Sequence, residues 1–225
     1  MITIGFADNN KVIESVRERI MSEGIFQTKI YNSVESAIED LLSKKIDCLI
    51  GGHDMSTAEY LKRIFKIIKP KNRIYSYSVL KKDNQIYFFA DTGINITLSN
   101  SQKIELENLL KNEVGKFFDI HIAKLGFKTD NETLQVDAAL FPEIAEKKGI
   151  KDSKVHNTFI FPDLHSANIG YKMIQHLGGY EHIGPILLGI GYYISDLSRG
   201  ASQKEIYDTA IYLGNLTLKS TKEKA

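Results

Sequence analysis

The segment DLSRGASQKE, residues 196–205, gathers side chains that could bind an anion. Arg199 offers a planar fork of donors suited to phosphate, Ser198 offers a hydroxyl, and Gly200 lets the backbone approach a ligand closely. A helix is predicted to begin near Ser202, so its free backbone N–H groups and positive dipole end would face the same point. The residue types and their spacing therefore indicate a phosphate-binding turn.

The same residues also match an ordinary helix start. Ser202 and Glu205 fit the S-x-x-E capping box, in which the two side chains satisfy backbone N–H groups of the first turn. On spacing alone this capping interpretation is favoured, and the anion site stays open as its alternative. In DLHSANIGYK, Asn168 and Lys172 could approach a ligand or begin a helix, and spacing again favours the helix.

The sequence contains no motif typical of a metal-binding or nucleotide-binding site. The six histidines show neither H-E-x-x-H nor Cys/His metal spacing. The phosphate-binding loops G-x-x-x-x-G-K-[ST] and G-x-G-x-x-G are both absent from the sequence. We therefore expect no metal ion and no bound cofactor.

Alternating strands and helices must position these residues. Residues 1–52 read as three strands separated by two helices, which is the pattern of a parallel sheet covered by helices. A helix then runs to Pro70, and two strands of a β-hairpin, RIYSYSVL and QIYFFADTG, precede another helix. Three further strands, IHIAKLG, TLQVDAAL and NTFIFPDL, alternate with helices before a terminal helix.

This order of elements predicts an α/β fold with two α/β lobes around a cleft, where such folds bind ligands. The first lobe takes residues 1–65 plus 196–225, and the second takes residues 66–195. The terminal helix is expected to return to the first lobe, because three strands alone bury too little apolar surface.

Composition excludes several classes of protein. The 225 residues include 29 basic and 28 acidic ones, so no overall field favours nucleic acid or an anionic membrane. Cys48 is the single cysteine, which fits a reduced intracellular setting without disulfides. The first residues show no basic leader, and no apolar stretch approaches the roughly 18 residues of a membrane span. We expect a soluble, cytoplasmic protein.

Three segments of the chain follow one another in the order LQVDAALFPEIAEKKG, NTFIFPDLHSANIGYKMIQHLGGYEHIGPILLGI and DLSRGASQKEI. Together they resemble the carboxyl-terminal half of the phosphate acetyl/butyryltransferases. Upstream, LIGGHDMSTAEYLKRIFKII, FFADTGIN and LGFKT are similar to weaker family segments. The resemblance implies the phosphate acetyltransferase (isocitrate/isopropylmalate dehydrogenase-like) fold, a homodimer, and acyl transfer between a coenzyme A thioester and phosphate.

The resemblance also implies roles for individual residues. DLSRG is similar to the segment that holds the family's active-site serine and phosphate-binding arginine, which places them at Ser198 and Arg199, with Gly200 beside the phosphate. Glu205 stands where the family commonly has an aspartate that takes the thiol proton. Asn168 and Lys172 stand where family members line the cleft.

Other positions depart from the family pattern. In LGFKT, Gly126 and Lys128 replace two serines of the loop expected to bind the acyl phosphate, and Thr129 is kept. Lys62 replaces a ligand-binding arginine, and Met55 replaces a histidine. The first lobe is also short, a layout similar to the methanogenesis marker protein 4 branch, which is assigned as methyltransferase subunit X (MtxX).

Three functions therefore stay open. The first is acyl transfer between coenzyme A and phosphate through Ser198, Arg199 and Glu205. The second is a methyltransferase-complex subunit of methanogenesis, bound to other subunits and without acyltransferase activity. The third is a non-catalytic protein that binds phosphate or a coenzyme A-like anion.

Overall fold

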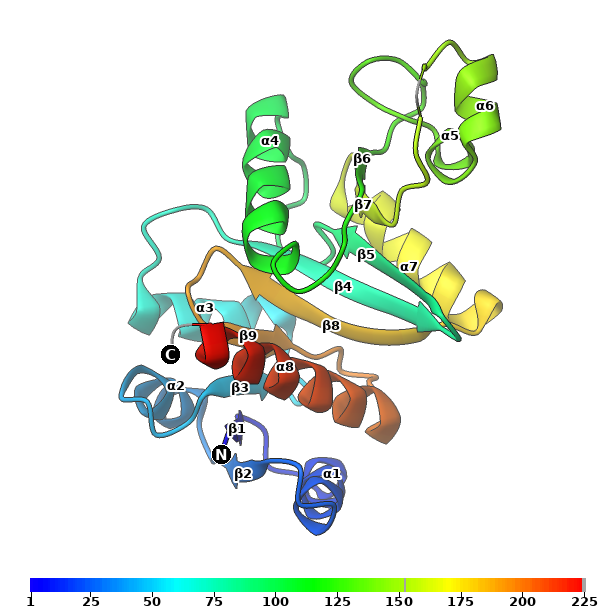
Figure 1. The fold of residues 1–225 in the computed structure, drawn as a ribbon. Coiled ribbons are helices and arrows are strands. Elements are labelled where there is room, and N and C mark those ends of the chain that lie inside the picture. The colour runs from blue at the N-terminus through cyan, green and yellow to red at the C-terminus, as the bar shows by residue number, and fades with distance from the viewer. Residues whose placement is uncertain (152, 224–225) are drawn as a thin grey trace. The chain divides into compact units, whose positions relative to one another are not determined.

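The computed structural model describes residues 1–151 and 153–223, which fold as two compact units. Unit 1 comprises Met1–Ile74 and the residues from Ile183 onward, and unit 2 comprises Tyr75–His182 (Figure 1). Both units combine a sheet with helices, so the predicted α/β class is confirmed. Within the described residues, no helix has the length and apolar character needed to cross a membrane.

Unit 1 is built on a mainly parallel sheet with the strand order β2-β1-β3-β9-β8. Strands β2, β1, β3 and β9 run parallel, and β8 pairs with β9 in the opposite direction. The strands are β1 (Thr3–Phe6), β2 (Gln27–Ile30), β3 (Cys48–Gly51), β8 (Glu181–Leu188) and β9 (Tyr193–Asp196). The helices are α1 (Lys11–Ser22), α2 (Val34–Leu42), α3 (Thr57–Ile68) and α8 (Gln203–Glu223).

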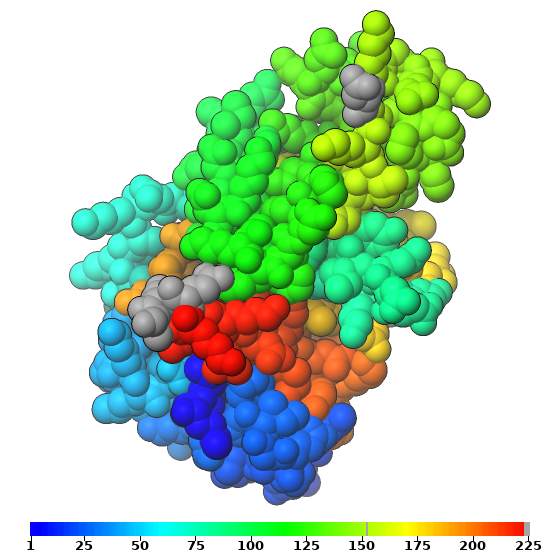
Figure 2. Space-filling view, in the orientation of Figure 1, coloured from blue at the N-terminus to red at the C-terminus, as the bar shows by residue number. Residues whose placement is uncertain are grey.

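The terminal helix α8 completes the core of unit 1. It packs against α1, β1, β3 and β9. Its buried residues Ile206, Ala210 and Leu213 recur at helical spacing and give it one apolar face. Figure 2 shows the orange and red surface of this helix against the blue surface of the amino-terminal residues. By packing on β1, β3 and β9, this helix fixes the position of the turn that precedes it.

Unit 2 contains the predicted hairpin, and its four strands follow the order β4-β5-β7-β6. Strands β4 and β5 are antiparallel, while β7 runs parallel to both β5 and β6. The strands are β4 (Tyr75–Lys82), β5 (Gln85–Ala90), β6 (Ile122–Lys124) and β7 (Thr158–Ile160). The helices are α4 (Asn100–Leu109), continued by the π-helical turn η1 (Leu110–Val114), α5 (Val136–Leu140), α6 (Pro142–Lys147) and α7 (Leu164–Gly178).

Two sequence expectations differ from the structure. The strand predicted over TLQVDAAL is wrong, because only Leu134 bridges to Leu125 beside β6 and Val136–Leu140 forms α5. The consecutive buried residues Ala138 and Ala139 favour a helix over a half-buried strand. The expected lobe boundaries also differ from those of the units, because β9 pairs with β3 and so extends the sheet of unit 1.

Candidate functional site

The predicted anion-binding turn connects β9 to α8 in unit 1. Ala201 N donates to Ser198 O at 2.9 Å, and Gly200 N donates to Ser198 Oγ at 3.4 Å, so the chain reverses tightly. Ser198, Arg199 and Gly200 are exposed, and the space beside the Gly200 Cα is open. The turn thus presents a hydroxyl, a guanidinium and open backbone to solvent.

The start of α8 is a complete capping box. Ser202 N donates to Glu205 Oε2 at 2.8 Å, and Glu205 N donates to Ser202 Oγ at 3.2 Å. Because each side chain satisfies the backbone of the other residue, the first turn of α8 is fixed. The capping interpretation of Glu205 is confirmed, and it leaves the carboxylate half-exposed within the same short segment as Arg199.

Arg199 and Lys62 are two cations of unit 1 that the sequence assigned to ligand binding. Within the described chain, no carboxylate pairs with Arg199, whereas Arg19 and Arg63 of the same unit each pair with one. Lys62 is exposed on α3, and no described contact joins it to the turn. The structure therefore gathers Ser198, Arg199, Gly200 and Glu205 in one segment and places Lys62 on a separate helix of the same unit.

Two buried carboxyl groups lie at the carboxyl ends of parallel strands in unit 1, and one of them, Asp196, lies just before the turn. Asp196 ends β9 and is 4% exposed, and Asp8 follows β1 and is 3% exposed. The Asp8 oxygens accept hydrogen bonds from His53 N at 3.0 Å and Asp54 N at 3.2 Å, just beyond β3. Carboxyl ends of adjacent parallel strands are where open α/β sheets bind ligands.

Asp196 is held close to the end of β3 and the start of α3. Its carboxyl hydrogen-bonds to the Thr57 side chain, while its buried Oδ1 atom has no partner among the described residues. A Cβ on Gly52 would lie 2.3 Å from that Oδ1, and Gly52 has a φ of +91°. Glycine is therefore required at this position both for its backbone conformation and for the close approach of Asp196.

Burial dominates the electrostatics of this pair. The pKa of Asp196 is raised to about 6: burial is the largest cause, the Thr57 hydrogen bond opposes it, and the charge of Asp8 adds to it. Burial also raises the pKa of Asp8, against the two backbone N–H groups that stabilise its charge. The fully buried Tyr60 hydroxyl has no partner among the described residues, and burial and both carboxylates raise its pKa.

The loop that follows β6 in unit 2 carries Lys128 and Thr129. Lys128 is exposed, and its carbonyl oxygen accepts a hydrogen bond from Thr133 Oγ1 at 3.0 Å. The Thr129 hydroxyl accepts one from Gln135 N at 3.1 Å. The threonine kept from the family loop thus supports the loop itself, whereas the Lys128 side chain is exposed to solvent and its charge acts on Asp130.

Asn168 and Lys172 lie on α7 of unit 2. Asn168 Nδ2 donates to Tyr171 Oη at 3.4 Å, and Lys172 Nζ lies 6.0 Å from the centroid of the Tyr171 ring. The Asp163 side chain caps this helix by accepting a hydrogen bond from Ser166 N at 2.8 Å. The helix start expected from spacing is therefore present, and both predicted ligand-lining residues follow it.

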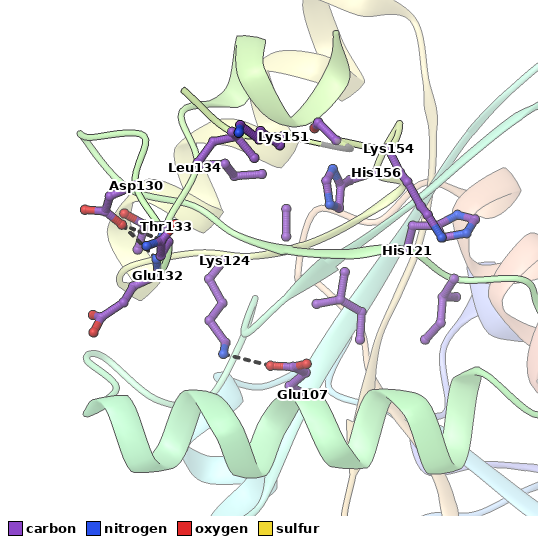
Figure 3. Close-up of a pocket in the computed structure, with 16 residues that line it drawn as sticks. Glu107, His121, Lys124, Asp130, Glu132, Thr133, Leu134, Lys151, Lys154 and His156 are labelled. Carbon is purple, nitrogen blue, oxygen red and sulfur yellow. Dashed lines mark hydrogen bonds and ion pairs between the residues drawn. The ribbon is translucent and has the colours of Figure 1, made fainter. Parts of the chain in front are cut away.

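A pocket of about 540 Å³ opens elsewhere in unit 2, beside the edge strand β6 (Figure 3). Lys124 reaches from β6 to Glu107 on α4, with 2.7 Å between Nζ and Oε2. His121, Lys151 and Lys154 also line it. None of the site residues expected from the sequence lines this pocket.

The sequence analysis missed Asp8, Tyr60 and Asp196 as members of a site. A signal existed, because Asp8 and Asp196 each close an apolar strand segment, ITIGFAD and YYISD. No group of three or more His, Cys, Asp or Glu side chains suited to a metal ion occurs in the described part of the chain.

Comparison with known proteins gives the family. A family model for phosphate acetyl/butaryl transferase matches residues 7–132 and 123–213. The chain is 31% identical over 234 residues to a phosphate acetyltransferase of Bacillus subtilis (strain 168), which covers 88% of this chain and 68% of that protein. It is 33% identical over 205 residues to a phosphate acetyltransferase of Staphylococcus aureus (strain Mu50 / ATCC 700699), covering 74% of this chain and 62% of the relative. The chain thus matches less than two thirds of the staphylococcal protein.

Solved structures agree at the level of the fold. A phosphotransacetylase from Streptococcus pyogenes superimposes with a TM-score of 0.84 at 24% identity, over 97% of this chain and 94% of that one. A branched-chain phosphotransacylase from Enterococcus faecalis V583 superimposes with a TM-score of 0.79 at 15% identity, over 97% and 100%. With most of its length matched by the family model, the chain belongs to the phosphate acetyl/butaryl transferase family.

Proposed function

We propose that the chain transfers an acyl group between coenzyme A and inorganic phosphate at the turn formed by residues 198–200. The observation that supports this most is the exposed Arg199, which has no carboxylate partner in the described chain and lies just before the amino terminus of α8. A guanidinium and a helix amino terminus both favour a bound phosphate. The names of the matched relatives support the same reaction class.

The proposed reaction balances without a metal or redox cofactor. A phosphate oxygen attacks the thioester carbonyl carbon, the C–S bond breaks, and coenzyme A leaves as a thiolate that takes up a proton. Arg199 neutralises the phosphate, and Ser198 Oγ donates a hydrogen bond to the carbonyl oxygen as negative charge develops there. In the reverse direction the thiol loses its proton, attacks the acyl phosphate and releases phosphate.

Glu205 is the proposed base for the thiol proton. Its contact with Ser202 N fixes the direction of the carboxylate relative to the turn. A base held within reach of the reacting group contributes rate mainly through its position and its protonation state. As the resemblance implies, Lys62 is proposed to contribute to ligand binding from unit 1, and Lys128, Asn168 and Lys172 are proposed to do so from unit 2.

A second function, ligand binding without turnover, is favoured by the loop after β6. Gly126 and Lys128 stand where the family has hydroxyl side chains, and the Thr129 hydroxyl is engaged by Gln135 N. In this alternative the chain is an anion-binding protein or a methyltransferase-complex subunit of the methanogenesis marker protein 4 branch. The branch, the complex partners and the homodimer stay predictions.

The test is an assay for free thiol. The purified chain is mixed with phosphate and acetyl-, propionyl- or butyryl-coenzyme A, and Arg199→Ala serves as the inactive control. Phosphate-dependent thiol release that Arg199→Ala loses is the expected result. Phosphate binding without thiol release from any of the three thioesters would replace acyl transfer with the binding function.

A further inference from the structure

The buried carboxyl of Asp196 is joined directly to the anion-binding turn. Leu197 N, the next backbone group, donates to Gly51 O at 2.6 Å, and Ser198 follows. The Asp196 side chain fills the space left by the missing Cβ of Gly52 and contacts Thr57 at the start of α3. One carboxyl therefore joins β9, the double glycine after β3 and α3 at the point where the turn begins.

The environment of this carboxyl does not suit a charge. Asp196 and Asp8 are both more than nine-tenths buried, and no lysine or arginine within the described chain pairs with either. Asp8 receives two backbone N–H groups, so it is the member that keeps a negative charge. Among the residues that the structure describes, Asp196 Oδ1 accepts no hydrogen bond, and the buried Tyr60 hydroxyl nearby has no partner either.

We propose that Asp196 is a positioning residue for the anion-binding turn, and that it does this as the proton-bearing member of a buried carboxyl pair with Asp8. Protonated Asp196 holds the end of β9 against Gly52 and adds no charge beneath the turn. When it releases its proton to solvent, a second negative charge appears beside Asp8, and the anion bound at residues 198–200 is repelled.

The size of this coupling follows from the chain itself. Arg199 is three residues after Asp196 and Ser198 is two, and two residues of extended chain span at most about 7 Å between Cα atoms. The side chains of both residues add to this separation, and unit charges about 10 Å apart change an affinity by roughly twofold in water and roughly fifteenfold near a protein surface. We expect about a tenfold difference in anion affinity between the two protonation states.

The other ionisable groups around Asp196 define the controls. Asp8 faces it from the segment after β1, His53 and Asp54 lie in the segment after β3, and Tyr60 lies on α3. Arg199 and Glu205 follow Asp196 along the chain. Histidine is the residue type most often responsible for titration between about pH 5 and pH 8, so His53 must be tested separately.

Calorimetric titration with sulfate tests the proposal, because sulfate keeps two negative charges from about pH 5 to pH 8 while phosphate does not. At constant ionic strength, the wild type is expected to bind sulfate about tenfold more weakly at the upper end of this range. Asp196→Asn should bind with the tighter affinity at every pH. Asp8→Asn should move the transition to lower pH, and His53→Gln should leave it unchanged.

The proposal has several ways to fail. If the sulfate affinity of Asp196→Asn still depends on pH, or if that of His53→Gln no longer does, the titrating proton belongs to another group. Weak sulfate binding by Asp196→Asn at every pH would show that Asp196 has a purely structural role. Stabilisation by potassium ions that Asp196→Asn removes would show that a cation occupies the pair. If the wild type binds no sulfate anywhere between about pH 5 and pH 8, the proposal is wrong. It rests on the anion site of the proposed function but not on turnover, so a negative thiol assay leaves it intact.

Discussion

Arg199 is the residue whose removal separates an anion site from a simple helix connection. A charge-assisted hydrogen bond to phosphate contributes about 1.5–3 kcal/mol. Because no described carboxylate shares the guanidinium, the full contribution is available to a ligand. We therefore expect Arg199→Ala to weaken phosphate binding by roughly tenfold to a hundredfold, measured by calorimetry.

Arg199→Lys is the matched control. Lysine keeps the charge but lacks the planar fork, so an intermediate affinity is expected if phosphate is held by two parallel hydrogen bonds. Far-UV circular dichroism should show no change in either variant, since Arg199 is exposed. Equal affinity in the wild type and Arg199→Ala would exclude the turn as the phosphate site.

Glu205 has a confirmed structural role and a proposed chemical one, and one substitution separates them. Glutamine accepts a hydrogen bond at the third helical position, so Glu205→Gln should keep the contact with Ser202 N and most of the stability. If the carboxylate removes the thiol proton, the same change should lower turnover by about 10²- to 10⁴-fold. The measurement is the thiol assay beside a urea denaturation curve.

Ser202→Ala supplies the opposite control for Glu205. It removes the hydroxyl that accepts from Glu205 N and should cost about 1 kcal/mol of stability. Turnover per folded molecule should change far less than in Glu205→Gln. If the wild type and Glu205→Gln release thiol at the same rate, Glu205 is a cap alone.

At the scale of elements, the docking of α8 depends on close packing at Gly214. A Cβ there would lie 2.7 Å from Phe26 Cε2, and Phe26 is buried. Replacing glycine by alanine inside a helix gains up to about 1 kcal/mol, whereas overpacking costs about 1–3 kcal/mol. We expect Gly214→Ala to lower the free energy of unfolding by up to about 2 kcal/mol.

Asn215→Ala, one residue further along α8, is the control for Gly214→Ala. Asn215 is exposed, so this change should give only the gain in helix propensity, about 0.5 kcal/mol. Both variants can be followed by circular dichroism in urea, since the chain has no tryptophan. A more stable Gly214→Ala would show that Phe26 moves aside and that α8 tolerates a looser fit.

Local patterns in the sequence predicted the elements better than their long-range pairing. The hairpin of β4 and β5 and the capping box of Ser202 and Glu205 depend on neighbouring residues, and both are present. The strand predicted over the α5 segment was wrong because VDAAL does not alternate regularly between apolar and polar residues and its alanines favour a helix. The pairing of β9 with β3 joins residues far apart in the chain, which no local period encodes.

The residues of the candidate site likewise fall into those that share one sequence segment and those that only long-range strand pairing brings together. Ser198, Arg199 and Glu205 could be found because they share one segment with a recognisable motif. Asp8 and Asp196 are brought together only by parallel strands from opposite ends of the chain, and their burial is a property of the packed sheet. Spacing in the sequence therefore could not reveal that two carboxyl groups share one buried environment.

At the scale of the whole molecule, the buried pair makes stability depend on pH in an unusual direction. The folded-state pKa of Asp196 is raised from 3.8 to about 6. Stability from this group is fully present below about pH 3.8, because folded and unfolded chains are then both protonated, and it is lost as the pH rises through about 6. The whole shift of about two units corresponds to about 3 kcal/mol.

Carboxylates with lowered pKa, such as Asp40, Asp137 and Asp163, give the opposite slope, because their stabilisation is lost as the pH falls through their folded-state values. The wild type and the Asp196→Asn variant both contain these carboxylates. The difference in their free energies of unfolding therefore reports Asp196 alone. Between about pH 4 and pH 7 we expect the wild type to lose about 2 kcal/mol relative to Asp196→Asn, measured by urea denaturation. Parallel curves for the two proteins would mean that Asp196 titrates normally and is hydrated in solution. A variant that is more stable near neutral pH yet has lost its pH-dependent sulfate affinity would instead show that the chain keeps a buried acid for function, against its own stability.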